Sequence, residues 1–154
     1  MKIITRELLD QVTGEARGSA RLRKNHNLHP SDDFCCHRLL NAMEPGSYIQ
    51  PHRHLDPNKD ESMVILRGRL GVVSFDGAGA VTGTRLLQPG DAVAVDIPHG
   101  EFHTVVSLEP GTVFFEAKAG PYLPLAGEEK ASWAPAEGDG GAGTYHASLV
   151  ALFC

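Results

Sequence analysis

Long apolar runs are missing from this 154-residue sequence. No stretch of about 18 apolar residues occurs, so no membrane-spanning helix is predicted. The first residues also lack the continuous apolar segment of a signal peptide. Because both features are missing, we expect a cytoplasmic protein with no membrane partner.

Cysteine is scarce as well. The three cysteines are an odd number, and two of them, Cys35 and Cys36, are adjacent. A secreted disulfide framework needs an even number at wider spacing. We therefore expect the cysteines to be small apolar core residues, with a redox or metal role for the adjacent pair as the alternative.

Basic residues are fewer than acidic ones. The sequence has 14 lysines and arginines against 19 acidic residues, a formal net charge of −5. Nucleic-acid binders usually carry a basic face, and the one tight basic cluster, Arg21, Arg23 and Lys24, is too small to form one. Nucleic acid is therefore not expected as a partner, whereas a small-molecule ligand with a phosphate or carboxylate is compatible with that cluster.

The share of core-forming residues is ordinary. The sequence is 42% hydrophobic and 21% charged, as in typical soluble domains. A chain of this length forms one domain that buries roughly 70% of its surface. Such a core needs no metal for stability, so any bound metal is expected to be functional rather than structural.

Short apolar runs separated by turn residues dominate the sequence from residue 20 onward. The runs include residues 63–66, 70–75, 92–97, 103–108 and 112–117. Proline and glycine pairs such as Pro89-Gly90 stand between them. Many short strands at near-regular spacing predict an all-β sandwich or barrel.

The two ends of the chain differ from this pattern. Apolar residues recur at helical spacing from Ile4 to Val12, and Thr5 suits a helix start, so a short amphipathic helix is predicted over residues 6–16. Prolines and glycines accumulate after residue 120. We therefore expect an N-terminal helical segment at 1–19, a β-barrel at 20–120, and an irregular C-terminal tail at 121–154 that packs on the barrel.

The residues with the clearest chemistry lie in two segments flanked by turns. His52 and His54 are two residues apart, so in a strand both side chains project to one face and can bind one ion. Glu61 opens the next apolar run and can bring a carboxylate from the adjacent strand. A Pro-x-Gly turn places His103 at the start of a later strand, from which it can close the site.

Three imidazoles and one carboxylate suit one divalent transition metal, such as iron, manganese, nickel, copper or zinc. If the ion is octahedral, four protein ligands leave two positions for water or substrate, as a catalytic metal requires. The choice of carboxylate stays open at this point, because Asp56 and Asp60 can compete with Glu61.

The order of these residues resembles the two sequence motifs of the cupin superfamily. Residues 46–68 are similar to the first motif, with a gap between His54 and Glu61 that is longer than usual by a few residues. Residues 90–103 are similar to the second motif. This resemblance implies a cupin double-stranded β-helix, that is, a jelly-roll barrel, with a bound metal.

A closer resemblance, over about residues 1–137, is to the WbuC family of cupin-fold metalloproteins. It is carried by Arg-Leu-Arg-Lys-Asn-His-Asn-Leu-His at 21–29, Leu-Leu-Asn-Ala-Met-Glu-Pro-Gly at 39–46 and Phe-Phe-Glu-Ala-Lys-Ala-Gly-Pro-Tyr at 114–122. The resemblance implies a metal-binding protein, linked in some members to bacterial surface-polysaccharide (O-antigen) gene clusters. It also implies a homodimer, since folds of this kind often dimerise.

A second polar line accompanies the predicted metal site. Five polar side chains alternate along residues 21–29 and share one face if this segment is a strand: Arg21, Arg23, Asn25, Asn27 and His29. Arginine binds carboxylate or phosphate with two hydrogen bonds, and asparagine can bind sugar hydroxyls. We expect this line to bind the ligand at the mouth of the metal pocket; the alternative is an exposed sheet edge.

Three further residues are candidates for the same pocket. Tyr48, four residues before His52, lines the pocket if it projects with the histidines, or else packs within the barrel. Glu116 and Lys118 share one face of a strand and, beside a metal, are expected to act as an acid–base pair. If exposed, they form only a solvated ion pair.

Together these features predict a metal-dependent cupin that acts on a small polar molecule. A sugar or a sugar-derived acid is the expected substrate, and an isomerase, an epimerase or an oxygenase is the expected enzyme. The alternatives are a module that binds a sugar at the metal without turnover, and a structural metal in an interaction protein.

Overall fold

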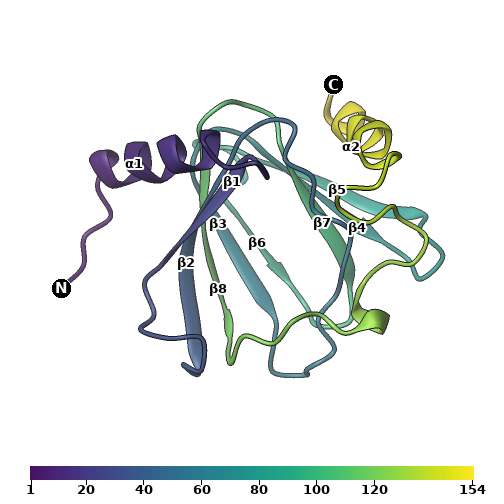
Figure 1. Ribbon diagram of the computed structural model, residues 1–154, viewed down its shortest axis with the longest axis horizontal. Coiled ribbons are helices and arrows are strands. Elements are labelled where there is room, and N and C mark those ends of the chain that lie inside the picture. The colour runs from purple at the N-terminus through teal and green to yellow at the C-terminus, as the bar shows by residue number, and fades with distance from the viewer.

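The computed structural model describes all residues from 1 to 154. The chain forms two antiparallel sheets and two helices longer than one turn (Figure 1). The elements in chain order are α1 (Arg6–Arg17), β1 (Arg23–Asn27), β2 (Cys36–Met43), β3 (Glu61–Arg67), β4 (Leu70–Phe75), β5 (Val81–Leu87), β6 (Ala94–Ile97), β7 (Phe102–Ser107), β8 (Thr112–Ala119), the 3₁₀ turn η1 (Gly127–Glu129), α2 (Ala142–Val150) and the 3₁₀ turn η2 (Ala151–Phe153).

The two sheets face each other and enclose the core. The larger has the strand order β1-β2-β8-β3-β6 and the smaller the order β5-β4-β7. Apolar residues of both sheets, among them Met43, Ile65, Val72 and Phe114, form one buried cluster between them. The all-β class with a short N-terminal helix is therefore confirmed.

The inner face of the larger sheet changes from polar to apolar along its strands. His37, Lys118 and Glu61 are register partners on the neighbouring strands β2, β8 and β3, so their side chains share one face. Met43 lies on the same face of β2, six residues after His37, and belongs to the apolar cluster. One end of the barrel is thus closed by packing, while the other carries polar groups.

Helix α1 lies across the outer face of the larger sheet (Figure 1). The Thr5 side chain accepts a hydrogen bond from Leu8 N at 3.3 Å and caps the helix start, as its position predicts. The buried residues Leu9, Val12 and Ala16 pack against apolar residues of β2 and β8. The helix predicted over residues 6–16 is therefore confirmed, with one residue more at its end.

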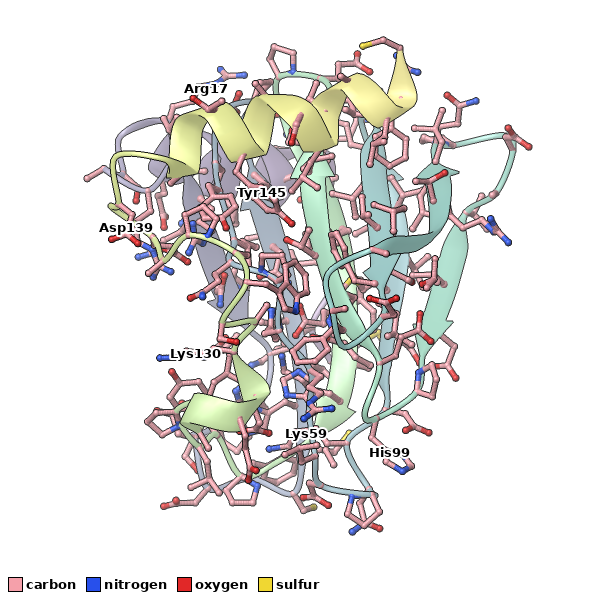
Figure 2. The ribbon with its side chains drawn as sticks, turned by 90° about the vertical axis from the view of Figure 1, so that its right-hand side faces the viewer. Arg17, Lys59, His99, Lys130, Asp139 and Tyr145 are labelled. Atoms are coloured by element: carbon pink, nitrogen blue, oxygen red, sulfur yellow. The ribbon has the colours of Figure 1, made fainter.

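The C-terminal segment is more regular than its composition predicts. Instead of an irregular tail, residues Ala142–Val150 form α2, because the prolines end at Pro135 and an apolar helix face finds a partner. Tyr145 and Leu149 pack against the outer face of the smaller sheet, on Val73 and Val106. Figure 2 shows α2 lying across this face, with Tyr145 pointing toward the barrel.

The expectation that the cysteines are core residues is wrong. The three cysteines are free and exposed rather than buried, because Cys35 and Cys36 precede the buried part of β2 and Cys154 ends the chain. No helix of the structure combines the length and the apolar character that crossing a membrane requires.

Candidate metal centre

The four predicted metal ligands converge on one point at the polar end of the barrel. One donor atom from each of His52, His54, Glu61 and His103 lies within 4.8 Å of the other three. Donors that bind one ion at about 2.1 Å are at most about 4.2 Å apart, so only a small adjustment is needed. This group of three histidines and one glutamate can therefore hold one metal ion.

Backbone pairing brings the histidines together from distant parts of the chain. His52 N donates to His103 O at 3.0 Å, and His103 N donates to His52 O at 2.8 Å. His52 and His54 lie outside the regular strands, so strand alternation is not the reason that both rings face the cluster. His52 is instead held by pairing on two sides, with His103 and with Lys130, and His54 O accepts from Gly100 N at 2.7 Å.

The hydrogen bonds of the imidazoles leave one ring nitrogen of each for a metal. His52 Nδ1 lies 3.2 Å from Gln50 O, and His103 Nδ1 lies 3.0 Å from Glu101 O. Donation of the Nδ1 proton to these carbonyls directs Nε2 toward the centre, as in many metal-binding histidines; there His103 Nε2 lies 2.9 Å from Glu61 Oε2. Burial and the nearby His103 lower the pKa of His52 to about 3, so its ring is neutral and able to coordinate.

The environment of His54 shows whether the cluster suits a metal ion. Its Nε2 is buried and has no hydrogen-bond partner, and it lies 3.5 Å from Glu61 Oε2. An unpaired buried polar atom is costly, and a metal ion at the centre of the cluster satisfies it. The donor set of this chain thus fits a divalent transition metal.

Glu61 is the carboxylate of the cluster. It is 2% exposed and lies at the first position of β3, whereas Asp56 and Asp60 are exposed. Asp60 accepts hydrogen bonds from His99 at 2.8 Å, and Asp56 closes a turn with Asn58. Burial opposes the ionisation of Glu61, but the Lys118 ammonium and the bond to His103 hold its pKa well below the usual range.

The predicted acid–base pair lies directly beside the cluster. Lys118 Nζ lies 2.8 Å from Glu61 Oε1 and 2.7 Å from Glu116 Oε1, and Asn41 donates to Glu116 Oε2 at 2.6 Å. Burial and the charge of Glu61 raise the pKa of Glu116 to about 7. Glu116 and Lys118 are therefore not a solvated pair but part of a buried polar network.

A cavity of about 760 Å³ opens over this network. His52, Glu61 and His103 form part of its wall, together with Glu116 and Lys118. Five of the six predicted ligand-binding residues also line it: Arg21, Arg23, Asn25, Asn27 and His29. The polar line of residues 21–29 therefore faces the cavity as well as forming the sheet edge.

Tyr48 is the exception among the predicted pocket residues. Its hydroxyl donates to Pro135 O at 2.7 Å, and its ring packs edge-on against Tyr145 and His146. Residues four apart, such as Tyr48 and His52, project to the same face only in a continuous strand. Residues 44–51 form no strand. The packing alternative is therefore the one found, and the predicted pocket position of Tyr48 is wrong.

Several polar residues of the cavity were not predicted, among them Asn41, His37, Gln50 and Glu137. Asn41 and His37 lie on the inner face of β2, and Gln50 precedes His52 by two residues. Gln50 Nε2 donates to Ala131 O at 2.9 Å and ties the histidine segment to the C-terminal segment. The alternation of β2, in which His37 and Asn41 share a face, was the signal available for the first two.

Comparison with solved structures identifies the fold. The structure of KdgF from Halomonas sp. is 22% identical over 66% of this chain and 82% of that one, with a TM-score of 0.51. The conserved SPY1581 protein of unknown function from Streptococcus pyogenes is 13% identical over 79% and 90%, with a TM-score of 0.53. A cupin superfamily protein from Desulfitobacterium hafniense is 18% identical over 63% and 76%, with a TM-score of 0.49. The likeness to KdgF, a cupin-superfamily protein, confirms the predicted cupin fold.

Comparison of sequences gives a family. No curated protein matches the chain. Residues 4–87, more than half of the chain, match the model of one protein family. This protein therefore belongs to the family described as "Domain of unknown function (DUF6016)".

Proposed function

We propose that this protein is a metal-dependent enzyme that acts on a sugar or a sugar-derived acid. The observation that carries the proposal is the position of the four-donor cluster in the wall of an open polar cavity, beside a buried glutamate and lysine. His52, His54, Glu61 and His103 would hold the metal, which would supply Lewis-acid polarisation of a carbonyl or hydroxyl group. Iron, manganese, nickel and zinc all suit three imidazoles and one carboxylate.

Glu116 and Lys118 are the candidate catalytic residues of this enzyme. Both line the cavity, and Lys118 joins Glu116 to the metal-ligand candidate Glu61. A carboxylate and an ammonium side by side can accept a proton from one position of a substrate and return it to a neighbouring one. Such a transfer is the chemistry of an isomerase or an epimerase; an oxygenase requires a redox-active metal instead.

The polar lining supports the substrate class. Asn25, Asn27 and His29 offer donors and acceptors for hydroxyl groups, and Arg21 and Arg23 suit an acidic group. The resemblance to the WbuC family supports a place in bacterial surface-polysaccharide metabolism. A sugar-sized molecule fits a cavity of about 760 Å³.

A binding module without turnover is the second candidate. Both carboxylates beside Lys118 are already hydrogen-bonded to it, so neither is free in the absence of a ligand. A network of this kind can also serve only to stabilise a ligand pocket. The two candidates differ in whether a bound sugar changes chemically.

The test begins with the metal content of the purified protein, measured by plasma mass spectrometry. The protein loaded with each of the four metals is then incubated with aldoses, ketoses and sugar acids in D₂O, and the products are followed by NMR. Deuterium uptake beside the carbonyl identifies an isomerase or epimerase, and oxygen consumption identifies an oxygenase. Tight binding of an unchanged sugar supports the binding module.

His103→Ala is the control for metal dependence, and His99→Ala is the matched control, because His99 lies outside the cluster. Activity must disappear in the first variant and persist in the second. A wild-type protein that binds none of the four metals after reconstitution contradicts the proposal.

A further inference from the structure

The carboxylate of Glu137 forms hydrogen bonds with two arginines of the cavity, Arg21 and Arg23. Arg21 donates to Glu137 from Nε and Nη2, each at 3.0 Å, and Arg23 Nη2 donates to the same carboxylate at 2.5 Å. All three residues line the cavity. Three charge-assisted hydrogen bonds from two guanidinium groups are the geometry by which proteins bind a ligand carboxylate.

The barrel holds Arg23 independently of Glu137. The Arg23 side chain is only 14% exposed, and its Nη1 donates to Tyr48 O at 2.9 Å. Ser47 Oγ lies 3.4 Å from the same Nη1 and in turn donates to Arg21 O at 2.8 Å. One arginine of the pair is therefore preorganised to present Nη2 to an anion, whichever anion is present.

Glu137, by contrast, lies on an exposed loop, and its side chain forms ion pairs only with the two arginines. Residues 136–141 are all exposed, and Figure 2 shows Asp139 on this loop, which leads into α2. The segment is anchored on both sides of the loop, by the bond from Tyr48 to Pro135 O and by the packing of α2. Displacement of the Glu137 side chain therefore requires only local movement of the loop.

The charges at this position do not balance. Two arginines share one carboxylate, and no other acidic side chain is within ion-pair distance of either. Because one positive charge remains uncompensated, the pair attracts a further anion.

We propose that Arg21 and Arg23 form the carboxylate subsite of the cavity, and that Glu137 occupies it until the carboxylate of a ligand displaces it. The inference rests on the proposed function, which places a ligand in this cavity, and it makes that ligand a polyhydroxy acid rather than a neutral sugar. Glu137 acts as an internal competitor that weakens the binding of every carboxylate ligand. If the subsite is free in about one-tenth of molecules, the apparent affinity is reduced about tenfold.

The experiment compares two probes of equal length, D-gluconate and D-sorbitol, which differ by one carboxylate. Each is titrated by calorimetry into wild type, Glu137→Gln and Glu128→Gln, with a metal bound and after its removal by EDTA. Glu128 is the matched control, an exposed glutamate of the same segment whose side chain is in no ion pair. We expect Glu137→Gln to bind gluconate about tenfold more tightly and sorbitol no differently, and Glu128→Gln to match wild type.

Two further variants, Arg23→Gln and Arg21→Gln, remove one guanidinium group each. Arg21 is the more exposed of the two residues, so its replacement disturbs the fold less. Each must reduce the preference for gluconate over sorbitol, and circular dichroism confirms that each is folded. Equal gluconate affinity in wild type and Glu137→Gln overturns the proposal and leaves Glu137 as a latch for the C-terminal segment. A preference for gluconate that persists in EDTA, in a protein that binds no metal, sinks the proposed function but supports the subsite.

Discussion

Lys118 Nζ lies 2.8 Å from Glu61 Oε1, across the neighbouring strands β8 and β3 in which the two residues are register partners. One carboxylate oxygen of Glu61 is thereby engaged, while the other, Oε2, lies 2.9 Å from His103 Nε2. The ammonium group thus compensates a carboxylate that also faces the metal cluster. Because Lys118 binds Oε1, Oε2 is the oxygen of Glu61 that faces the metal cluster.

The variant Lys118→Met tests this relationship. Loss of a partner from a largely buried ion pair leaves Glu61 and Glu116 uncompensated, so we expect metal-free protein to lose about 2 kcal/mol of unfolding free energy or more. For a domain of this size the melting temperature then falls by about 4–8 °C. In metal-loaded protein the cation takes over part of the compensation, and the fall is smaller.

Differential scanning calorimetry of both forms makes the measurement, with Lys130→Met as the control. Lys130 lines the same cavity but is exposed and forms no ion pair. Equal losses with and without metal would show that Lys118 does not share the charge of Glu61 with the ion.

The identity of the carboxylate ligand is tested by a pair of isosteric variants. Glu61→Gln keeps the shape of the buried side chain but removes its charge, and we expect metal affinity to fall by about 100-fold or more. Asp60→Asn makes the same change one residue earlier, on an exposed side chain bound to His99. It should retain wild-type metal content after dialysis, as measured by plasma mass spectrometry. Equal metal loss in both variants contradicts the assignment of Glu61.

The sequence predicts two of the four metal ligands from strand geometry, because Glu61 and His103 lie at strand starts fixed by turns, whereas His52 and His54 lie outside the regular strands. Glu61 is the first residue of β3 and His103 the second of β7, and the parity of a strand then decides which face each side chain takes. Parity likewise places Glu116 and Lys118 on the inner face of β8. The same rule fails for Tyr48, because the segment before His52 is extended but forms no continuous ladder.

Two other features depend on contacts that no local pattern reveals. Glu137 is 116 residues from Arg21, and its position follows from how the C-terminal segment crosses the barrel. Helix α2 has no side-chain cap and contains Gly143, so its local signals are weak. Packing on the smaller sheet stabilises it, as tertiary contacts often outweigh propensity.

The turn between β3 and β4 depends on Gly68. Its φ of +80° is unfavourable for any residue with a Cβ, and a Cβ there lies 2.7 Å from Thr112 Cα. We expect Gly68→Ala to lower the unfolding free energy by at least about 2 kcal/mol, from backbone strain plus displacement of β8. Gly83→Ala, within β5 where nothing lies within 4 Å, is the control and should be neutral or slightly stabilising. Urea denaturation followed by circular dichroism compares the two, and equal midpoints contradict the prediction.

The C-terminal segment and the barrel are expected to unfold as one unit. Trp133, the only tryptophan of the chain, packs on Phe75 and Phe102 with ring centroids 5.0 and 5.9 Å away. Its fluorescence therefore reports the docking of the segment, whereas far-ultraviolet circular dichroism reports mainly the sheets. Coincident transitions of the two signals in urea are the expected result.

Leu149→Ala strengthens this test, because Leu149 is 3% exposed in the same cluster as Phe75 and Phe102. The cavity left by the change should lower the unfolding free energy by about 2–4 kcal/mol and shift both transitions together. Leu152→Ala, three residues later and 43% exposed, is the matched control and should shift neither by more than about 0.5 kcal/mol. If Leu149→Ala shifts the fluorescence transition alone, the segment is a separate unit that merely covers the barrel.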